Sequence, residues 1–289
     1  MKRFIITTLI LAVSALSLSA QDGKYTLKNG NVTMTVNANE GGKIISFKYG
    51  EQEVLNQGRF PNSYGSTFWT SPQKEWNWPP VREHDMLPCI ANQFGDKLVL
   101  ASKLSQKIPL RIMKTFSTDE KDGSFVVSYT IKNESDQDRK VSPWEISRVP
   151  NDGIIFFEAP AEEIWPADLM KFESAYGLSW YSVDTANENR KVNCDGKGWL
   201  AYASNGLLLV KRFQDIKKTA PAPDEAEIQV YVNVGKTYIE LESQGAYTNL
   251  KPGETLTWTV KWFLVPTDAA LTPNAALASQ AKKLGHSKF

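Results

Sequence analysis

Hydrophobic and polar residues alternate strictly along the segment from 227 to 266. Successive side chains of a β-strand point to opposite faces, so each position can be assigned to one face. The pattern predicts three strands joined by short turns. The third strand places its apolar residues on one face: Leu256, Trp258, Val260, Trp262 and Leu264. The first two strands have an apolar face and a polar face. We expect four polar-face residues to contact a polar ligand: Tyr231, Asn233, Tyr238 and Glu240.

Similar alternating segments, separated by turns, continue through most of the chain. Asn29-Gly30 lies between two of them and is a strong hairpin signal. We predict a meander of strands from 97 to 149 and a second hairpin around Asn205-Gly206. Alanines following Pro273 predict a short C-terminal helix. The fold class is therefore all-β, a large antiparallel sandwich. No linker or repeat divides residues 21–289, which we expect to form one domain.

The segment from 58 to 80 is rich in proline and contains six aromatic residues without strand periodicity. Long irregular segments in compact domains are usually functional or disordered, and this one is too aromatic for disorder. Because pyranose rings present apolar C–H faces, we expect this loop to contact a sugar through Trp69, Trp76 and Trp78. The alternative is that these rings only pack the loop onto the sheet.

Two motifs near the C-terminus resemble a known superfamily. Leu241-Glu242-Ser243-Gln244 is followed by Leu250-Lys251-Pro252-Gly253-Glu254 and then by the long alternating strand. This order is similar to the C-terminal motif of the aldose 1-epimerase (galactose mutarotase-like) superfamily. The resemblance implies a β-supersandwich, a carbohydrate ligand and a general-base role for Glu242. It is strongest to an exported branch that keeps this glutamate strand and lacks the usual histidines.

The chain departs from that superfamily at the expected general acid. Trp144-Glu145 stands where the resemblance would place a catalytic histidine. Outside the N-terminal segment only His84 and His286 are present, and His286 is close to the C-terminus. The remaining candidates for proton transfer are Glu145 and His84, with Arg82 beside His84 as a substrate contact. Glu240 has a second interpretation, in which it forms an ion pair with Lys261 on a solvated face.

The first twenty residues have the pattern of a secretory signal peptide. Lys2-Arg3 precedes an apolar run, which ends in small residues at Ser19-Ala20. We therefore expect export to the periplasm or the medium, and no cysteine follows to carry a lipid anchor. No second apolar run is long enough for a membrane span. Two cysteines, Cys89 and Cys194, could form a disulfide in that compartment or remain buried thiols.

Charge and motifs exclude several classes of function. Removing Lys2 and Arg3 from the 33 basic residues leaves 31 against 32 acidic residues, so nothing favours nucleic acid. No phosphate-binding loop or zinc-ligand spacing is present, and we expect no cofactor and no metal. Calcium has no fixed ligand spacing and stays open. The leading function is carbohydrate binding, with or without epimerase chemistry. The alternatives are a carboxylate-based glycan hydrolase or lyase and a noncatalytic glycan-binding module.

Overall fold

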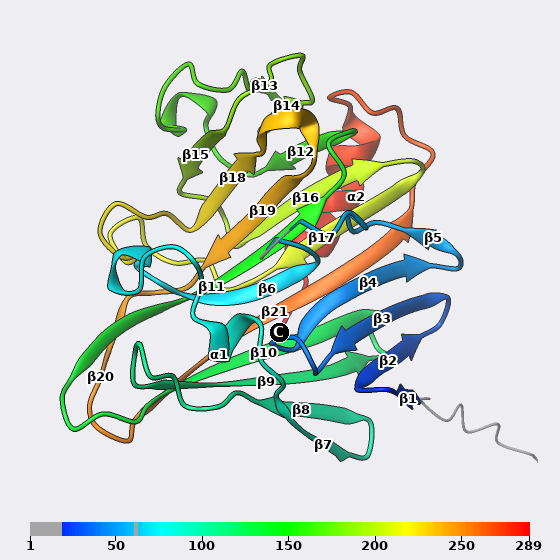
Figure 1. The fold of residues 1–289 in the computed structure, drawn as a ribbon. Helices are drawn as coiled ribbons and strands as arrows, with labels where there is room; N and C mark the ends of the chain where they lie inside the picture. The colour runs from blue at the N-terminus through cyan, green and yellow to red at the C-terminus, as the bar shows by residue number, and fades with distance from the viewer. Residues whose placement is uncertain (1–18, 61–62) are drawn as a thin grey trace, which may run out of the picture.

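The computed structural model describes residues 19–60 and 63–289, without the side chains of Ser19 and Lys236. Most of the predicted signal peptide, residues 1–18, therefore lies outside the described residues. The described chain forms two large antiparallel sheets that pack face to face, as an all-β sandwich requires (Figure 1). None of its described helices is long and apolar enough to cross a membrane.

The first sheet contains the central strands on which the candidate site lies. Its strands run in the order β1 (Ser19–Gln21), β2 (Lys24–Asn29), β3 (Val32–Asn37), β4 (Lys43–Tyr49), β6 (Ser66–Ser71), β11 (Arg139–Val149), β19 (Ile239–Gln244), β18 (Ile228–Val232) and β15 (Arg190–Cys194). Two short strands are added at its sides, where β5 (Gln52–Glu53) pairs with β4 and β20 (Thr248–Leu250) pairs with β11.

The second sheet closes the other side of the core. Its order is β13 (Glu173–Ala175), β14 (Leu178–Ser182), β12 (Ile154–Phe157), β16 (Trp199–Ser204), β17 (Leu207–Arg212), β21 (Thr255–Pro266), β10 (Ser124–Asn133), β9 (Leu110–Asp119), β8 (Lys97–Ala101) and β7 (Ile90–Phe94). Both predicted hairpins are confirmed by these pairings. The predicted meander is confirmed for β8, β9 and β10, but its last strand, β11, crosses to the first sheet instead of pairing with β10. Aromatic rings fill the space between the sheets, and Phe68 stacks on Tyr129 with ring centroids 4.2 Å apart.

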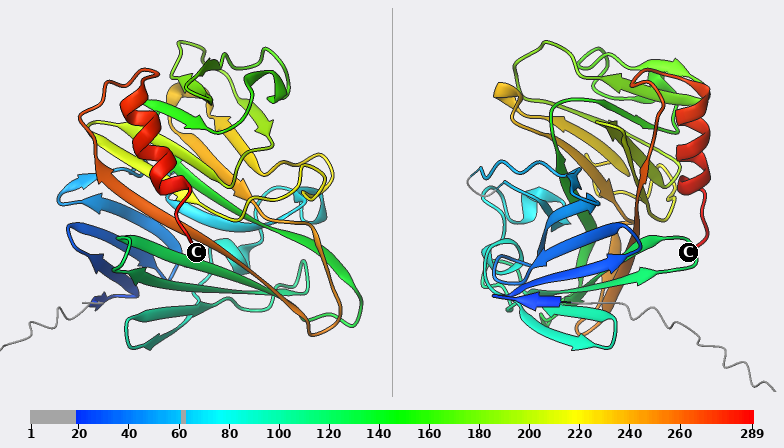
Figure 2. Two further views of the ribbon diagram at one scale, coloured as in Figure 1. Left: turned by 180° about the vertical axis from the view of Figure 1, so that it is seen from behind. Right: turned by 90° about the vertical axis from the view of Figure 1, so that its right-hand side faces the viewer.

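The predicted C-terminal helix is confirmed as α2 (Ala275–Gly285). Asn274 caps it, because its side-chain oxygen accepts a hydrogen bond from the Leu277 amide at 2.9 Å. The helix covers the outer face of the second sheet with Leu277, Ala278 and Ala281 (Figure 2). Gly285 permits this close approach, since a Cβ there would lie 2.5 Å from the Trp199 ring.

The remaining helical segments are short. They comprise α1 (Arg82–Asp85) and the 3-10 turns η1 (Gln73–Glu75), η2 (Ala161–Glu163) and η3 (Val234–Lys236). η2 ends upstream of Pro166, whose ring disfavours a longer helix there. Both Cys89 and Cys194 are free thiols, which settles the disulfide alternative for this structure.

Two sequence predictions about strands were incomplete. The segment from 58 to 80 is not irregular throughout, because β6 runs through it and all six residues of that strand are buried. The three strands predicted from 227 to 266 also do not lie in one sheet. β18 and β19 are neighbours in the first sheet, whereas β21 belongs to the second. The turn around β20 carries the chain from one sheet to the other.

A buried ion pair connects the two sheets. Lys211 on β17 lies 2.8 Å from the Glu145 carboxylate on β11, and both side chains are fully buried. Tyr129 and the Trp262 indole donate hydrogen bonds to the second carboxylate oxygen of Glu145, at 2.5 Å and 3.1 Å. Burial lowers the pKa of Lys211, an effect that the nearby carboxylate of Glu145 opposes. The pair is therefore stable only while both partners are present.

Lys211→Met tests this connection. It leaves the carboxylate of Glu145 buried without a cation, so we expect the free energy of unfolding to fall by about 3–5 kcal/mol in urea denaturation. Lys218→Met is the matched control. Lys218 pairs with Glu163 at the surface, and its loss should leave the denaturation midpoint unchanged. An equally small effect of both substitutions would contradict a stabilising role for the buried pair.

Candidate functional site

The candidate site lies on the face of the first sheet that points away from the second. Residues directly opposite each other on four neighbouring strands form a row across this face: Arg148, Glu240, Tyr231 and Lys191. Two residues further along β19, Glu242 occupies the same face. Over this floor lies a pocket of about 370 Å³. The strand register thus brings predicted polar residues together in one cavity.

Aromatic and amide side chains form the walls of this pocket. Trp69, Trp78 and Trp144 line one part, and Tyr231, Asn233 and Tyr238 line another. The indole N–H of Trp69 donates to the carboxylate of Asp85 in α1 at 3.0 Å, which holds the ring in place. Trp69 contacts Trp144 edge to face, with centroids 5.3 Å apart, and Trp78 at 6.0 Å. Aromatic walls with polar groups between them are typical of small-molecule sites.

Glu242 is the central acidic group of the pocket. Its Oε2 accepts hydrogen bonds from the Trp144 indole at 2.8 Å and from the Lys191 ammonium at 2.9 Å. Both hydrogen bonds that the described residues make to this carboxyl group are on Oε2 and none is on Oε1, and the side chain lines the pocket. Burial raises the pKa of Glu242 to about 7, although Lys191 acts in the opposite direction. The carboxyl group can therefore exchange a proton near neutral pH.

Glu240 is held in a different way. Its carboxylate lies 2.7 Å from the guanidinium of Arg148, whose side chain is almost completely buried. That guanidinium lies over the rings of Trp69 and Tyr238, at 5.8 Å and 5.6 Å from the centroids. The alternative partner, Lys261, is on the second sheet and pairs with Asp119 and Asp122 instead. The Glu240 side chain is thus held in a fixed position in the pocket wall, and Arg148 neutralises its charge.

Trp76 and Trp78 lie in different surroundings although both were predicted to contact a sugar. The Trp76 side chain is 1% exposed, and its indole donates to the Thr70 carbonyl at 2.7 Å. Its ring packs behind Trp69, with centroids 5.7 Å apart, and does not line the pocket. Trp78 is 54% exposed and lines the pocket. Only Trp69 and Trp78 of the three predicted tryptophans therefore reach the cavity.

The structure does not bring Glu145, His84 or Arg82 to the pocket. Glu145 faces the second sheet and pairs with Lys211, whereas Arg148, three residues later on β11, lies at the site and pairs with Glu240. His84 is buried on α1, where its Nε2 is 3.0 Å from the Leu110 carbonyl oxygen. Burial lowers the pKa of His84 to about 4, which makes it neutral at physiological pH. Arg82 is exposed on the same helix.

Four pocket residues are not among the site residues predicted from the sequence: Ser63, Gln73, Trp144 and Lys191. Lys191 lies in the five-residue strand β15. Residues 190, 192 and 194 of this strand are buried and residues 191 and 193 are partly exposed, so alternation is the only local sign that Lys191 points away from the core. The described residues contain no group of three or more His, Cys, Asp or Glu side chains arranged to hold a metal ion.

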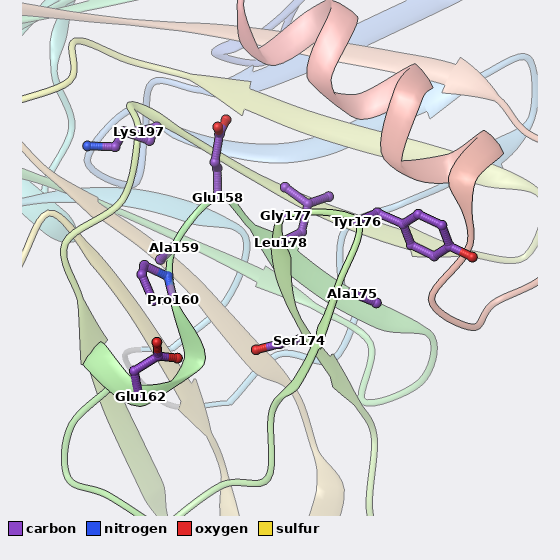
Figure 3. A pocket seen from close by; sticks show the side chains of 10 residues that line it. All are labelled: Glu158, Ala159, Pro160, Glu162, Ser174, Ala175, Tyr176, Gly177, Leu178 and Lys197. Atoms are coloured by element: carbon purple, nitrogen blue, oxygen red, sulfur yellow. The ribbon is translucent and has the colours of Figure 1, made fainter.

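Another hollow, of about 470 Å³, lies beside β12 and the β13–β14 hairpin. Figure 3 shows that its side chains do not converge, since Tyr176 projects toward α2 and Lys197 lies on the opposite side. The carboxylate of Glu158 is already bound by the Trp199 indole and by His286. The hollow therefore offers less for proton transfer than the pocket around Glu242.

Comparisons with known proteins give structural matches only. No family model matches the chain, and a search of curated proteins found no match. A candidate aldose 1-epimerase from Escherichia coli K12 superposes with a TM-score of 0.62 and 14% identity, over 84% of this chain and 99% of that one. The chain has a galactose mutarotase-like fold.

Two further structures with this fold support the assignment. A galactose mutarotase-related enzyme from Lactobacillus acidophilus gives a TM-score of 0.58 at 11% identity, over 85% of this chain and 98% of that one. A galactose mutarotase-like protein from Lactobacillus casei gives 0.57 at 12% identity, over 84% of this chain and all of the other. At these identities the likeness establishes the mutarotase-like fold, and the site has to be argued from its own residues.

Proposed function

We propose that the protein binds a carbohydrate in the pocket between Trp69, Trp78 and Glu240, and that Glu242 transfers a proton at the sugar's anomeric centre. One observation above all supports this function. Glu242 is a buried carboxyl group that lines the pocket, and both hydrogen bonds it accepts from described residues are on Oε2, which leaves Oε1 for a ligand. A fixed carboxyl with one open oxygen is suited to accept a hydroxyl proton.

The composition of the walls favours a sugar as the ligand. Sugars have apolar C–H faces and a rim of hydroxyl groups, so they bind best where aromatic rings and hydrogen-bonding groups alternate. The exposed ring of Trp78 and the edge of Trp69 offer the first kind of surface. Asn233, Tyr231 and Glu240 offer donors and acceptors for hydroxyl groups. Glu240 pairs with Arg148 and Glu242 pairs with Lys191, so these four side chains add little net charge to the pocket. This favours an uncharged sugar over a strongly acidic one.

Proton transfer at the anomeric hydroxyl would open the sugar ring and allow it to reclose on either face. The general base works best when its pKa lies near the working pH, and that of Glu242 lies at about 7. Glycoside hydrolysis is less well supported, because it needs a second carboxyl group across the bond. The nearest candidate, Glu240, is on the same strand and is neutralised by Arg148. A noncatalytic binding module is the remaining alternative.

Export is part of this proposal and rests on the residues before Gln21. Their charged start, apolar run and small-residue end are the features of a cleaved signal peptide. N-terminal sequencing of the protein from its native cells should therefore begin near Gln21. Recovery of the protein with Met1 intact would contradict export by this route.

Trp78→Ala and Trp76→Ala should separate binding from folding. We expect loss of the exposed Trp78 ring to weaken sugar binding by about 1–3 kcal/mol, roughly 5- to 150-fold, with little change in stability. Loss of the buried Trp76 ring should lower the free energy of unfolding by about 3–5 kcal/mol. Calorimetry with the tightest ligand from a glycan array, and urea denaturation, measure the two effects. Unchanged affinity in Trp78→Ala would remove that ring from the site.

Glu242→Gln tests the chemistry, because glutamine keeps the shape of the side chain and removes its basicity. If the α-anomers of glucose, galactose or xylose mutarotate faster with the wild-type protein, we expect Glu242→Gln to lower kcat by about 10²–10⁴-fold. Affinity should stay within about tenfold. The wild-type kcat/KM should rise with pH through about 7, because a raised pKa keeps Glu242 protonated, and unable to accept a proton, below that pH.

Polarimetry follows these reactions directly. Glu51→Gln is the matched control, since the Glu51 side chain is fully exposed outside the pocket, and it should behave as the wild type. A wild-type protein that binds these sugars without accelerating their mutarotation would contradict the catalytic part of the proposal and leave a binding module.

A further inference from the structure

Ring opening of a sugar requires an acid beside the base. The base removes the proton from O1 while the acid protonates the ring oxygen O5, and both oxygens are attached to the same carbon. The two protein groups must therefore reach adjacent atoms of the ligand. The superfamily resemblance implied a histidine for the acid, and His84 is buried away from the pocket. The donor has to be sought among the residues that line the cavity.

We propose that Lys191 is this proton donor. The assignment rests on the proposed function of Glu242 and adds a second catalytic residue to it. Lys191 lines the pocket, its side chain is 34% exposed, and its Nζ lies 2.9 Å from Glu242 Oε2. The ammonium group also lies 4.7 Å from the centroid of the Trp144 ring, which holds it over the pocket floor. An ammonium group keeps two further protons when one is donated to a carboxylate.

The other polar residues of the pocket are poorer donors. Burial raises the pKa of both Tyr231 and Tyr238, which weakens these phenols as acids. The guanidinium of Arg148 does not release a proton in proteins, and it is occupied by Glu240. Indole and amide N–H groups can orient a ligand but do not ionise at working pH. Lys191 is the one lining residue in the described chain that combines a labile proton with contact to the base.

The proton transfers balance within this pair. Glu242 Oε1 takes the proton from the O1 hydroxyl, and the O1 electrons form the carbonyl bond to C1. The C1–O5 bond breaks, its electron pair moves to O5, and Lys191 Nζ gives O5 a proton. The open-chain aldehyde then lies beside a neutral amine and a protonated carboxyl group. Rotation about the C1–C2 bond and the reverse steps close the ring as the other anomer and restore both groups.

Substitution of Lys191 by arginine and by methionine separates proton donation from charge. Arginine keeps a cation that can donate a hydrogen bond to Glu242, but it is too weak an acid to give up a proton. Methionine removes both properties. With the α-anomers of glucose, galactose and xylose as probes, we expect both variants to lose about 10²-fold or more in kcat, with KM changed less than tenfold.

The pH profile provides the second measurement. Lys191→Arg should keep the rise near pH 7, whereas Lys191→Met should shift it to higher pH, because a cation beside Glu242 is removed. Equal denaturation midpoints in urea confirm that the variants are folded.

Each outcome decides between distinct explanations. An active wild type together with an Lys191→Arg variant of near wild-type kcat would overturn the assignment, because Lys191 would then only neutralise Glu242. Such a result would leave the proposed function of Glu242 intact. A wild type without mutarotase activity on all three sugars would overturn the proposed catalysis and the role of Lys191 together.

Discussion

The rest of the structure depends on one constraint, which is that the two faces of β11 carry different side chains with different partners. Glu145 and Ser147 point into the sandwich, where the Lys211 ammonium binds both of them. Trp144 and Arg148 point to the opposite face and contact Glu242 and Glu240. A slip of one residue in strand register exchanges the two faces. It would move the cation of Arg148 away from Glu240 into the space between the sheets and leave Lys211 unpaired, so the internal ion pair specifies which side of β11 carries the site.

The pocket has a rigid floor and one carboxyl group, that of Glu242, which can gain or lose a proton near neutral pH. Arg148 and Glu240 neutralise each other at a fixed position, and α1 fixes Trp69 through Asp85. Glu242 differs because burial holds its pKa near neutrality and only one of its oxygens is occupied by protein donors. Binding and proton transfer are therefore assigned to different parts of a single face. The mutarotase-like fold supplies the strand, and local contacts supply the chemistry.

The sequence was sufficient for the fold class and for part of the site. Alternation placed Tyr231, Glu240 and Glu242 on one face, and the pairing of β18 with β19 gives them that arrangement. It could not decide which face Glu145 occupies, because β11 is buried on both sides from Val141 to Val149 and shows no alternation. The sequence does not distinguish β6 from a loop for the same reason, since its serines and threonines are as buried as its aromatic residues. The position of Lys191 in the pocket depends on the pairing of β15 with β18, two strands far apart in the sequence, and no local pattern predicts that pairing.

The central claim is that a sugar occupies the pocket with its anomeric oxygen beside Glu242. A crystal structure of the protein with the tightest ligand from a glycan array tests it most directly. We expect the sugar ring to lie against Trp78 and Trp69, with O1 within hydrogen-bonding distance of Glu242 Oε1. A sugar bound only in the hollow beside Glu158 and Lys197, with the pocket around Glu242 empty, would contradict it.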